Sequence, residues 1–518
     1  MFLTQGLHRA LQLHPYHTAT VFRERRHTFR ELGERVARLA GALQHHGMHT
    51  GDRVGMLALN SDRYLEYMLS TWWGGGVLNP VNTRWSVPEI VYSLDDCDTR
   101  ILLVDDNFLN MAKDIAQAAR VRPVLIHVGD APTPDGMLSY EHLIADASPV
   151  ADAQRGGNDL ATIMYTGGTT GRPKGVMQSH LNLWSSAMSR LASFVVPPNS
   201  PVLHVAPMFH TACLARLVVQ LIVGQAHVFI PSFDPLELMQ TIERERVTDL
   251  LLVPTMLQAL INHPEFSRHD LGSLKRMAYG ASPISAAVLE VALERLPGVE
   301  LTHGYGMTET SPGISSNGPE SHCAEGIASG RVRSAGRAVL GVNVKIVDES
   351  GNEVPRGTVG EIIAQGANVM LGYWNRPEET AHALRAGWMH TGDGGYMDDD
   401  GYLFIVDRLK DMIVTGGENV YSAEVENALG SHPAVASAAV IGIPSSKWGE
   451  AVHAVVALKP GQVASPDDLI AHCRERIAGY KCPKSVAFMT ALPLSGAGKI
   501  LKRDLREPYW QGHNRGVN

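Results

Sequence analysis

The hydrophobic pattern near the N-terminus changes from a helical period to a strand period. A helix is predicted from Thr28 to just before Gly47, and one of its faces carries the apolar residues Leu32, Val36, Leu39, Ala40 and Leu43. The short apolar run at 53–57 follows directly and has the pattern of a strand. A helix that leads into a strand is therefore the first predicted unit.

Short runs of leucine and β-branched residues recur farther along the chain. Residues 101–104 and 250–253 are two such runs, and both lie between segments with helical periodicity. Continuous apolar strands that alternate with helices are typical of parallel sheets covered by helices. The pattern predicts an α/β fold whose large part is built from layered, mostly parallel sheets.

The pattern changes beyond about Asp407 to a more compact α+β arrangement. We expect helices at 422–429 and 467–477, and strands at 438–443 and 451–458. A chain of 518 residues exceeds what one hydrophobic core normally supports. We therefore predict a large N-terminal domain at 1–408 and a small, mobile C-terminal domain at 409–518.

Composition and charge narrow the class of protein. The chain is 44% hydrophobic and 19% charged, with a net charge of -8, which is typical of a packed globular protein and argues against a nucleic-acid-binding role. The basic cluster around Arg25 is interrupted by Glu24 and runs into a capping-box pattern, Thr28 to Glu31, so we interpret it as a solvated face.

Cysteines and hydrophobic segments indicate a cytoplasmic protein. The five cysteines are odd in number and form no CxxC pair, which favours free thiols and no zinc site. The N-terminus has no signal-peptide pattern. The most apolar region, 214–230, contains Arg216, Gln220, Gln225 and His227 and is too broken for a transmembrane segment, so we expect it in the core.

The strongest chemical signal is the glycine- and threonine-rich stretch from Tyr165 to Gly175. Its backbone N–H groups, hydroxyls and lysine suit a polyphosphate. The members expected to bind phosphate are Thr166, Gly167, Gly168, Thr169, Thr170, Gly171 and Lys174. The stretch is not a P-loop, because Lys174 lacks the preceding glycine and the following Ser or Thr of that motif.

This stretch resembles the phosphate-loop signature of the adenylate-forming superfamily, which includes acyl-CoA synthetases, luciferases and peptide-synthetase adenylation domains. Further segments agree in order along nearly the whole chain: residues 279–283, 303–309, 388–393, 407–411 with 416–419, and 498–500. The resemblance implies an AMP-forming acid–thiol ligase that uses ATP and Mg²⁺ to make an acyl-adenylate and passes the acyl group to coenzyme A.

The resemblance also assigns roles to individual residues. Lys499 would bridge the attacking carboxylate and the α-phosphate, Thr308 would contact that phosphate, and Glu309 would bind magnesium. The remaining residues of the nucleotide site would be Gly280, Ala281, Ser282, Tyr305, Gly306, Asp393 and Arg408. Tyr305 would stack on adenine, with core packing as the alternative, whereas Asp393 and Arg408 would hold the ribose.

The small domain is expected to rotate between the two half-reactions, with Lys410 as the hinge. Gly416 and Gly417 would line the tunnel for the pantetheine arm, while Trp448 and Lys481 would contact coenzyme A. For Trp448, packing within the small domain is an equal alternative. Relatives often carry a basic residue where this chain has Cys482.

The acid is the least constrained substrate. The acyl pocket would be lined by His210, Ala281, Gly304 and Met307, with a core histidine as the less favoured alternative for His210. Apolar residues after it, including Leu214, Leu217, Val218 and Val219, favour a medium- or long-chain fatty acid. Aryl or hydroxycinnamic acids and transfer to a carrier protein are the alternatives, and a homodimer stays open.

A non-catalytic nucleotide sensor and an esterase are two other classes of protein that share part of this pattern. A non-catalytic nucleotide sensor would share the phosphate loop but would release no pyrophosphate. An esterase is disfavoured because residues 280–284 lack the closing glycine of a G-x-S-x-G elbow.

Overall fold

The N-terminal segments fold as the apolar periodicity predicts. The computed structural model describes residues 1–166, 173–193, 196–280, 284, 286–409, 411–416, 418–495 and 499–511. The predicted helix is α2 (Phe29–His45), and the strand after it is β3 (Arg53–Leu57). The capping box is confirmed: the Glu31 N–H donates to Thr28 Oγ1 at 3.3 Å, and the Thr28 N–H donates to Glu31 Oε2 at 2.7 Å.

Two large, mostly parallel sheets form the body of the molecule. The order of the first is β16-β15-β14-β13-β12-β10-β11-β1-β2, in which β1 and β10 to β14 run parallel. Its strands are β1 (Thr18–Phe22), β2 (Arg25–Thr28), β10 (Val202–His204), β11 (His227–Phe229), β12 (Asp249–Leu252), β13 (Arg276–Gly280), β14 (Glu300–Tyr305), β15 (Ser315–Asn317) and β16 (Arg337–Ala338).

The second sheet carries the strands on either side of the predicted phosphate loop. Its order is β19-β9-β8-β4-β3-β5-β6-β7, with β9 antiparallel to β8 and β19. Besides β3, its strands are β4 (Val77–Pro80), β5 (Ile101–Val104), β6 (Val124–His127), β7 (Leu138–Ser139), β8 (Leu160–Thr166), β9 (Lys174–Ser179) and β19 (Gly372–Tyr373).

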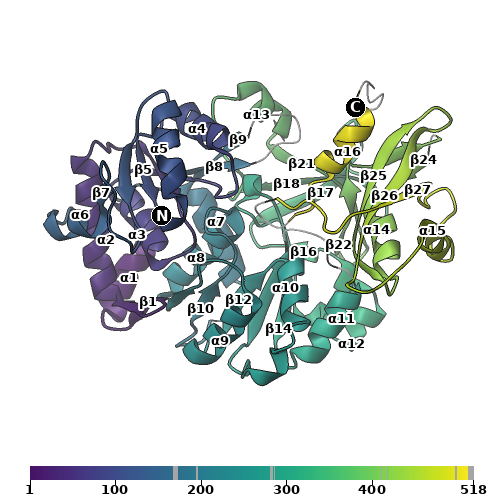
Figure 1. The fold of residues 1–518 in the computed structure, drawn as a ribbon, viewed down its shortest axis with the longest axis horizontal. Helices are drawn as coiled ribbons and strands as arrows, with labels where there is room; N and C mark the ends of the chain where they lie inside the picture. The colour runs from purple at the N-terminus through teal and green to yellow at the C-terminus, as the bar shows by residue number, and fades with distance from the viewer. Residues whose placement is uncertain are drawn as a thin grey trace.

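Two smaller antiparallel-rich sheets follow toward the C-terminus. The third contains β17 (Val342–Val347), β18 (Gly360–Gly366), β20 (Leu384–Arg385), β21 (Trp388–Met397) and β22 (Leu403–Arg408). The fourth contains β23 (Ile413–Thr415), β24 (Glu418–Val420), β25 (Val435–Ser445), β26 (Gly449–Leu458) and β27 (Ser485–Phe488). Figure 1 shows the yellow-green fourth sheet at one end of the molecule and the purple N-terminal segments at the other.

Helices cover these sheets, as expected of an α/β fold. In the large part they are α1 (Gln5–Leu13), α3 (Asp62–Trp73), α4 (Val87–Asp96), α5 (Leu109–Ala118), α6 (Tyr140–Asp146), α7 (His180–Leu191), α8 (Thr211–Val223), α9 (Pro235–Glu245), α10 (Pro254–Ile261), α11 (Ala286–Arg295), α12 (Ala324–Ala328) and α13 (Pro377–Ala383). Those around the fourth sheet are α14 (Ser422–Gly430), α15 (Pro466–Arg474) and α16 (Lys502–Trp510).

One predicted helix is longer than the helix observed. The pattern predicts 467–477, but α15 ends at Arg474. The Cys473 carbonyl accepts from the N–H groups of both Arg476 and Ile477, three and four residues on, so the chain leaves the helix through a turn of mixed 3₁₀ and α geometry. Apolar periodicity cannot register this change, because Ile477 still packs against the core of the fourth sheet.

The apolar region at 214–230 is core, as expected. It supplies most of α8 and β11, and Leu214, Leu217 and Val218 are buried in the main hydrophobic cluster. Among the described residues, no helix is long and apolar enough to cross a membrane. All five cysteines are free thiols, and Cys323 is the exposed one.

A hydrogen-bonded carboxylate joins the third sheet to the C-terminal unit. Asp407 in β22 accepts hydrogen bonds from the Ser422 N–H at 2.5 Å and from the Ser422 hydroxyl at 2.6 Å, at the start of α14. Strand β22 ends at Arg408, and the fourth sheet begins at Ile413. We propose that the boundary between the two units lies between these strands, after Arg408.

Asp407→Ala should destabilise the chain by about 1–3 kcal/mol, because both donors of Ser422 would lose a buried acceptor. The effect is measured by urea unfolding followed by circular dichroism. Asp399→Ala, at an exposed position nearby, is the matched control and should leave the free energy of unfolding unchanged. Equal stability of the two variants would contradict a joining role for Asp407.

Candidate active site

Asp393 is buried at the centre of a cluster formed by two paired strands and a third, in which Arg408 is the exposed member. Asp393 in β21 lies opposite Arg408 in β22, and Arg408 Nε is 3.2 Å from Asp393 Oδ1. The Tyr305 hydroxyl, at the end of β14, donates to Asp393 Oδ2 at 2.8 Å. Burial, and then the nearby carboxylate of Asp393, raise the pKa of Tyr305. The structure thus brings together three residues that the sequence places far apart.

Tyr305 also has a packing role. Its ring belongs to the hydrophobic cluster that includes Ile314 and Val342, and the side chain is buried. Gly306 follows it, and a Cβ at that position would lie 1.6 Å from the Pro312 carbonyl oxygen. Because only glycine fits there, the backbone after β14 turns closely past residues 312–313 and delivers the next side chains to the site.

Glu309 is held by a tyrosine that the sequence analysis did not identify. Thr308 and Glu309 form a short 3₁₀ turn after β14, and both are buried. The Tyr373 hydroxyl donates to Glu309 Oε1 at 2.8 Å, and Lys174 Nζ lies 5.1 Å from the centre of the Tyr373 ring. Tyr373 therefore connects the carboxylate with the lysine of the predicted phosphate loop.

Gln178 is a second residue that sequence reasoning missed. It is fully buried in β9, and its Nε2 donates to the Thr308 carbonyl at 2.8 Å and to the Ser311 hydroxyl at 3.0 Å. These bonds fix the turn that carries Thr308 and Glu309 against the second sheet. The only sequence signal was a polar residue directly after the apolar pair Val176 and Met177.

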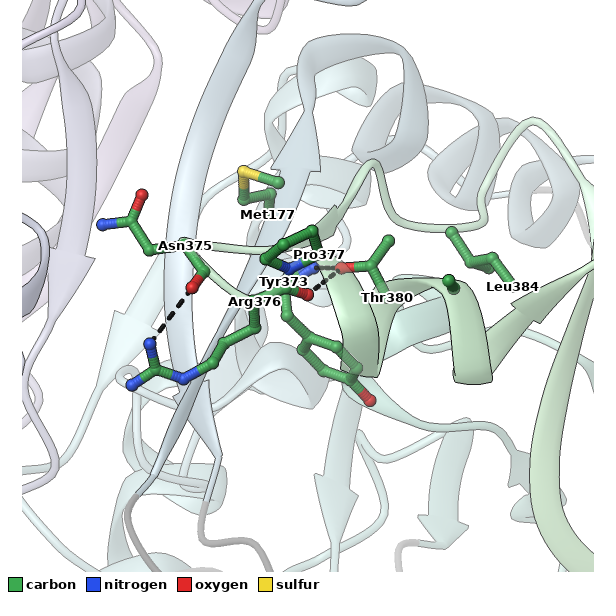
Figure 2. A pocket seen from close by; sticks show the side chains of 8 residues that line it. Met177, Tyr373, Asn375, Arg376, Pro377, Thr380 and Leu384 are labelled. Carbon is green, nitrogen blue, oxygen red and sulfur yellow. Dashed lines mark hydrogen bonds between the residues drawn. The ribbon is translucent and has the colours of Figure 1, made fainter.

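A surface pocket of about 470 Å³ lies on the outer side of the Tyr373 segment (Figure 2). There the Tyr373 N–H donates to the Thr380 hydroxyl, which donates to the Arg376 carbonyl, so that α13 is fixed against β19. The lining residues are Met177, Tyr373, Asn375, Arg376, Pro377, Thr380, Ala381 and Leu384. None of the site residues predicted from the sequence lines this pocket.

Lys499 reaches the same centre from the C-terminal end of the chain. Burial lowers the pKa of Lys499, and the positive charge of Arg408 acts in the same direction, whereas Asp393 and Glu309 oppose the shift. Lys499 in turn acts on His210, whose pKa is lowered to about 4, mainly by burial. Lys499 therefore lies within electrostatic reach of four predicted site residues, and His210 is neutral at neutral pH.

Arg84 holds the segment that presents Lys499. Arg84 Nη1 donates to the Ser495 carbonyl at 2.8 Å. The Ser495 N–H donates to the Lys499 carbonyl at 2.7 Å, and the Lys499 N–H donates to the Ser495 hydroxyl at 3.1 Å. A residue of the large part thus fixes the turn that carries the lysine, although no local motif marks Arg84.

Of the predicted acyl-pocket residues that the structure describes, Gly304 lies near the carboxyl end of β14 and Met307 shortly after it, and His210 lies at the start of α8. Gly280 and Gly304 face each other in register, and a Cβ on Gly304 would meet no atom within 4 Å. His210 occupies the N-cap position of α8 without a side-chain capping hydrogen bond, and Met307 packs beside the cluster of Val176 and Met370. Open space therefore lies in front of Gly304.

The predicted coenzyme A residues lie in the fourth-sheet unit. Gly416 has φ +61°, and a Cβ there would lie 2.9 Å from the half-exposed Trp448 ring. Lys481 Nζ is 2.8 Å from Glu424, and Cys482 is buried in the core of this unit. Within the described ranges, no recorded contact joins these residues to Asp393 or Glu309.

Several predicted residues fall outside the described part of the chain. They are Gly167, Gly168, Thr169, Thr170, Gly171, Ala281, Ser282, Lys410 and Gly417. Their flanking residues, including Thr166 at the end of β8 and Lys174 at the start of β9, are described. Nor do the described residues contain a cluster of three His, Cys, Asp or Glu side chains able to hold a metal ion alone.

Comparison with known proteins gives consistent matches. The model of the AMP-binding enzyme family matches residues 7–374, and that of the AMP-binding enzyme C-terminal domain matches 424–499. A feruloyl-CoA synthase from Amycolatopsis sp. is 39% identical over 502 residues, which cover 97% of this chain and 98% of that protein. The medium/long-chain-fatty-acid–CoA ligase FadD8 of Mycobacterium tuberculosis is 34% identical, and the match covers 98% of this chain and 90% of that protein.

Solved structures agree with the sequence matches. The anthranilate CoA ligase AuaEII in complex with anthranoyl-AMP superposes with a TM-score of 0.90 at 29% identity, covering 98% of this chain and 97% of that one. The family models cover both parts of the chain, and both curated relatives exceed 30% identity over nearly its whole length. The chain therefore belongs to the AMP-binding enzymes of the adenylate-forming superfamily, among the ATP-dependent acyl-CoA synthetases.

Proposed function

We propose that this enzyme activates an aromatic acid of the hydroxycinnamate type with ATP and transfers the acyl group to coenzyme A. The observation that supports activation is the convergence of Lys499 with His210, Asp393, Arg408 and Glu309. In the first step a carboxylate oxygen attacks the α-phosphorus of ATP and pyrophosphate leaves. In the second, a thiol sulfur attacks the acyl carbon, loses its proton and displaces AMP.

The role of Lys499 follows from charge. The attacking carboxylate and the α-phosphate are both negative, so an ammonium group between them offsets their repulsion where the new bond forms. Burial lowers the pKa of Lys499, but the carboxylates of Asp393 and Glu309 act in the opposite direction. Two anionic substrates would stabilise the protonated form further, so Lys499 is cationic when it is needed.

Asp393 would bind the ribose. An ionised carboxylate is only an acceptor and suits two sugar hydroxyls, while Arg408 can only donate. Tyr305 already occupies Asp393 Oδ2 and Arg408 lies beside Oδ1. The role we propose for Tyr305 therefore includes orientation of this carboxylate, in addition to contact with adenine.

The residues present fit a magnesium ion that is shared with the triphosphate. Mg²⁺ is usually held by one or two carboxylates together with substrate phosphates and water, so a three-carboxylate cluster is not needed. Glu309 supplies a carboxylate, the preceding residue Thr308 supplies a hydroxyl, and Tyr373 contacts both Glu309 and Lys174. Bound there, the ion would neutralise charge on the leaving pyrophosphate.

The space in front of Gly304 favours a flat acid. Gly304 has no side chain and faces open space, so a planar conjugated ring can lie against its backbone, whereas the neighbouring Gly280 packs against the Gly304 carbonyl. The fatty-acid preference rested on Leu214, Leu217, Val218 and Val219, and all four pack into the core. The first three are at most 1% exposed, and Val219 lines only a small cavity of about 30 Å³, so the fatty-acid preference stays an unsupported prediction.

Thiol transfer would require the fourth-sheet unit to move. Lys481 is engaged with Glu424, and Trp448 is half exposed, so neither faces the adenylate centre in this conformation. We propose that rotation near Lys410, which lies outside the described residues, brings Gly416 and Trp448 toward the acyl group. The conformation with Lys499 in the centre is then the one that makes the adenylate.

Lys499→Ala should reduce acid-dependent ATP–pyrophosphate exchange by about 10²- to 10³-fold, because a preorganised charge is lost. Thioester formation from a supplied acyl-adenylate should largely survive. Lys459→Ala, at an exposed position in the same unit, is the control. Equal damage to both half-reactions would mean that Lys499 is structural.

Glu309→Gln should raise the magnesium concentration needed for half-maximal exchange by about tenfold or more, because the ligand charge is removed. Tyr373→Phe should raise it by a smaller factor, since it removes only the hydrogen bond that orients Glu309. Tyr140→Phe is the matched control: the Tyr140 hydroxyl donates to Glu66 at 2.6 Å in a different part of the fold. A magnesium titration unchanged in both site variants would refute this role for Glu309.

A panel of acids tests the substrate class. Ferulate and 4-hydroxycinnamate should support faster pyrophosphate release and acyl-CoA formation than octanoate or palmitate. Gly304→Leu should lower the rate with the aromatic acids by about 100-fold, because its side chain fills the open space, whereas ATP affinity should persist. Faster turnover of the fatty acids by the wild-type enzyme would show that the aromatic assignment is wrong.

A further inference from the structure

One face of the first sheet is accessible along three adjacent strands. On β12, β13 and β14, Leu250, Met277 and Leu301 point into a tightly packed core and are buried. The alternate residues Leu251, Ala278 and Thr302 belong to the opposite face and are only partly buried. Partial exposure in the middle of a sheet indicates a channel over this face.

On this face the open space at Gly304 lies at the carboxyl ends of the strands, and a small cavity lies at their amino ends. Gly304 is also partly exposed and lies on the same face as Thr302, two residues earlier. Helix α8 borders this face, because Arg216 of α8 pairs with Asp249, the first residue of β12. The same helix begins beside His210 of the catalytic centre.

An arginine cluster lies at the far end of this channel. It consists of Arg190 at the end of α7, Arg216 in α8 and Arg276 at the start of β13, around the carboxylate of Asp249. Arg276 Nε is 3.6 Å from Asp249 Oδ2, and the side chains of Arg216 and Asp249 are 12% and 8% exposed. These residues line a cavity of about 30 Å³, enough for a group of one or two heavy atoms.

The cluster has more positive than negative charge. Three guanidinium groups surround one carboxylate, and the nearby His204 is neutral because burial lowers its pKa. In the described residues, no hydrogen bond or ion pair reaches the Arg190 side chain, and its Nε is buried without a partner. Burial and the proximity of Arg216 lower the pKa of Arg190 to about 10. Such an arrangement is costly unless an anionic or accepting group completes it.

We infer that the arginine cluster binds an oxygen at the far end of the acid substrate, opposite the carboxylate that reacts with ATP. This inference rests on the proposed function, because it places the acid along α8. The group bound there would be an acceptor or anionic oxygen, and either a para-hydroxyl or a second carboxylate on the ring would supply it. Guanidinium groups donate several directed hydrogen bonds to such an oxygen.

The dimensions agree with a rigid, para-substituted acid. Six residues of α8 separate His210 from Arg216, which corresponds to about 9 Å along the helix. Four residues of β13 separate Gly280 from Arg276, or about 13 Å along the strand. A conjugated propenoate on a benzene ring spans this separation once the arginine side chain reaches back toward the channel.

Three acids with the same spacer provide the test: cinnamate, 4-hydroxycinnamate and 4-carboxycinnamate. The readout is kcat/KM for acid-dependent ATP–pyrophosphate exchange. We expect the wild-type enzyme to favour at least one of the two substituted acids over cinnamate by about 10- to 100-fold, the effect of a hydrogen bond to a charged group. Comparison of 4-hydroxycinnamate with 4-carboxycinnamate shows whether a hydroxyl or a carboxylate supplies the oxygen.

Arg190→Met tests the site without breaking a recorded ion pair. It should remove most of the preference for the substituted acid while cinnamate keeps its kcat/KM, and Arg190→Lys should retain part of the preference. Arg268→Met, whose side chain is 73% exposed, is the control. The melting temperature of each variant shows whether the fold is intact.

The outcomes separate the two proposals. Equal use of all three acids by the wild-type enzyme, or an equal loss for cinnamate in Arg190→Met, would overturn the distal oxygen site while leaving aromatic acid activation in place. Absence of exchange with every aromatic acid, alongside exchange with octanoate, would instead overturn the proposed substrate class.

Discussion

The site depends on keeping an ammonium group charged where little water can reach it. Burial and Arg408 favour the neutral form of Lys499, and only Asp393 and Glu309 favour the charged form. Each carboxylate is in turn fixed by a tyrosine hydroxyl, Tyr305 for Asp393 and Tyr373 for Glu309. Strands from three sheets and the segment that carries Lys499 must therefore meet with the right charges before any substrate binds, which is the preorganisation that electrostatic catalysis requires.

Much of the fold and part of the site could be predicted from the chain alone. The helix after Thr28, the strand at 101–104 and the apolar core around Leu214 were predictable because burial and periodicity are local properties. The resemblance identified Asp393 and Arg408 because each lies in a contiguous motif. Their pairing across β21 and β22 is what the structure adds.

Other features depend on contacts between distant segments and leave little trace in the sequence. Tyr373 is 64 residues from Glu309, and Arg84 is 411 residues from Ser495. A single tyrosine or arginine has many ordinary roles, so nothing local distinguishes these two. The apolar run around Leu217 was correctly expected to be buried, but periodicity cannot tell a side chain that fills a core from one that lines a cavity. That is why the fatty-acid preference has no structural support.

The distribution of cysteines has a consequence for the redox chemistry of the enzyme. Burial raises the pKa of Cys97 and Cys473 to about 11 and that of Cys213 to about 12, so little of the reactive thiolate exists at neutral pH. Cys323 is exposed and lies outside the catalytic centre. Thiol-directed reagents therefore meet one accessible thiol, and a fluorophore attached there would report on the large part of the enzyme while its buried thiols stay unmodified.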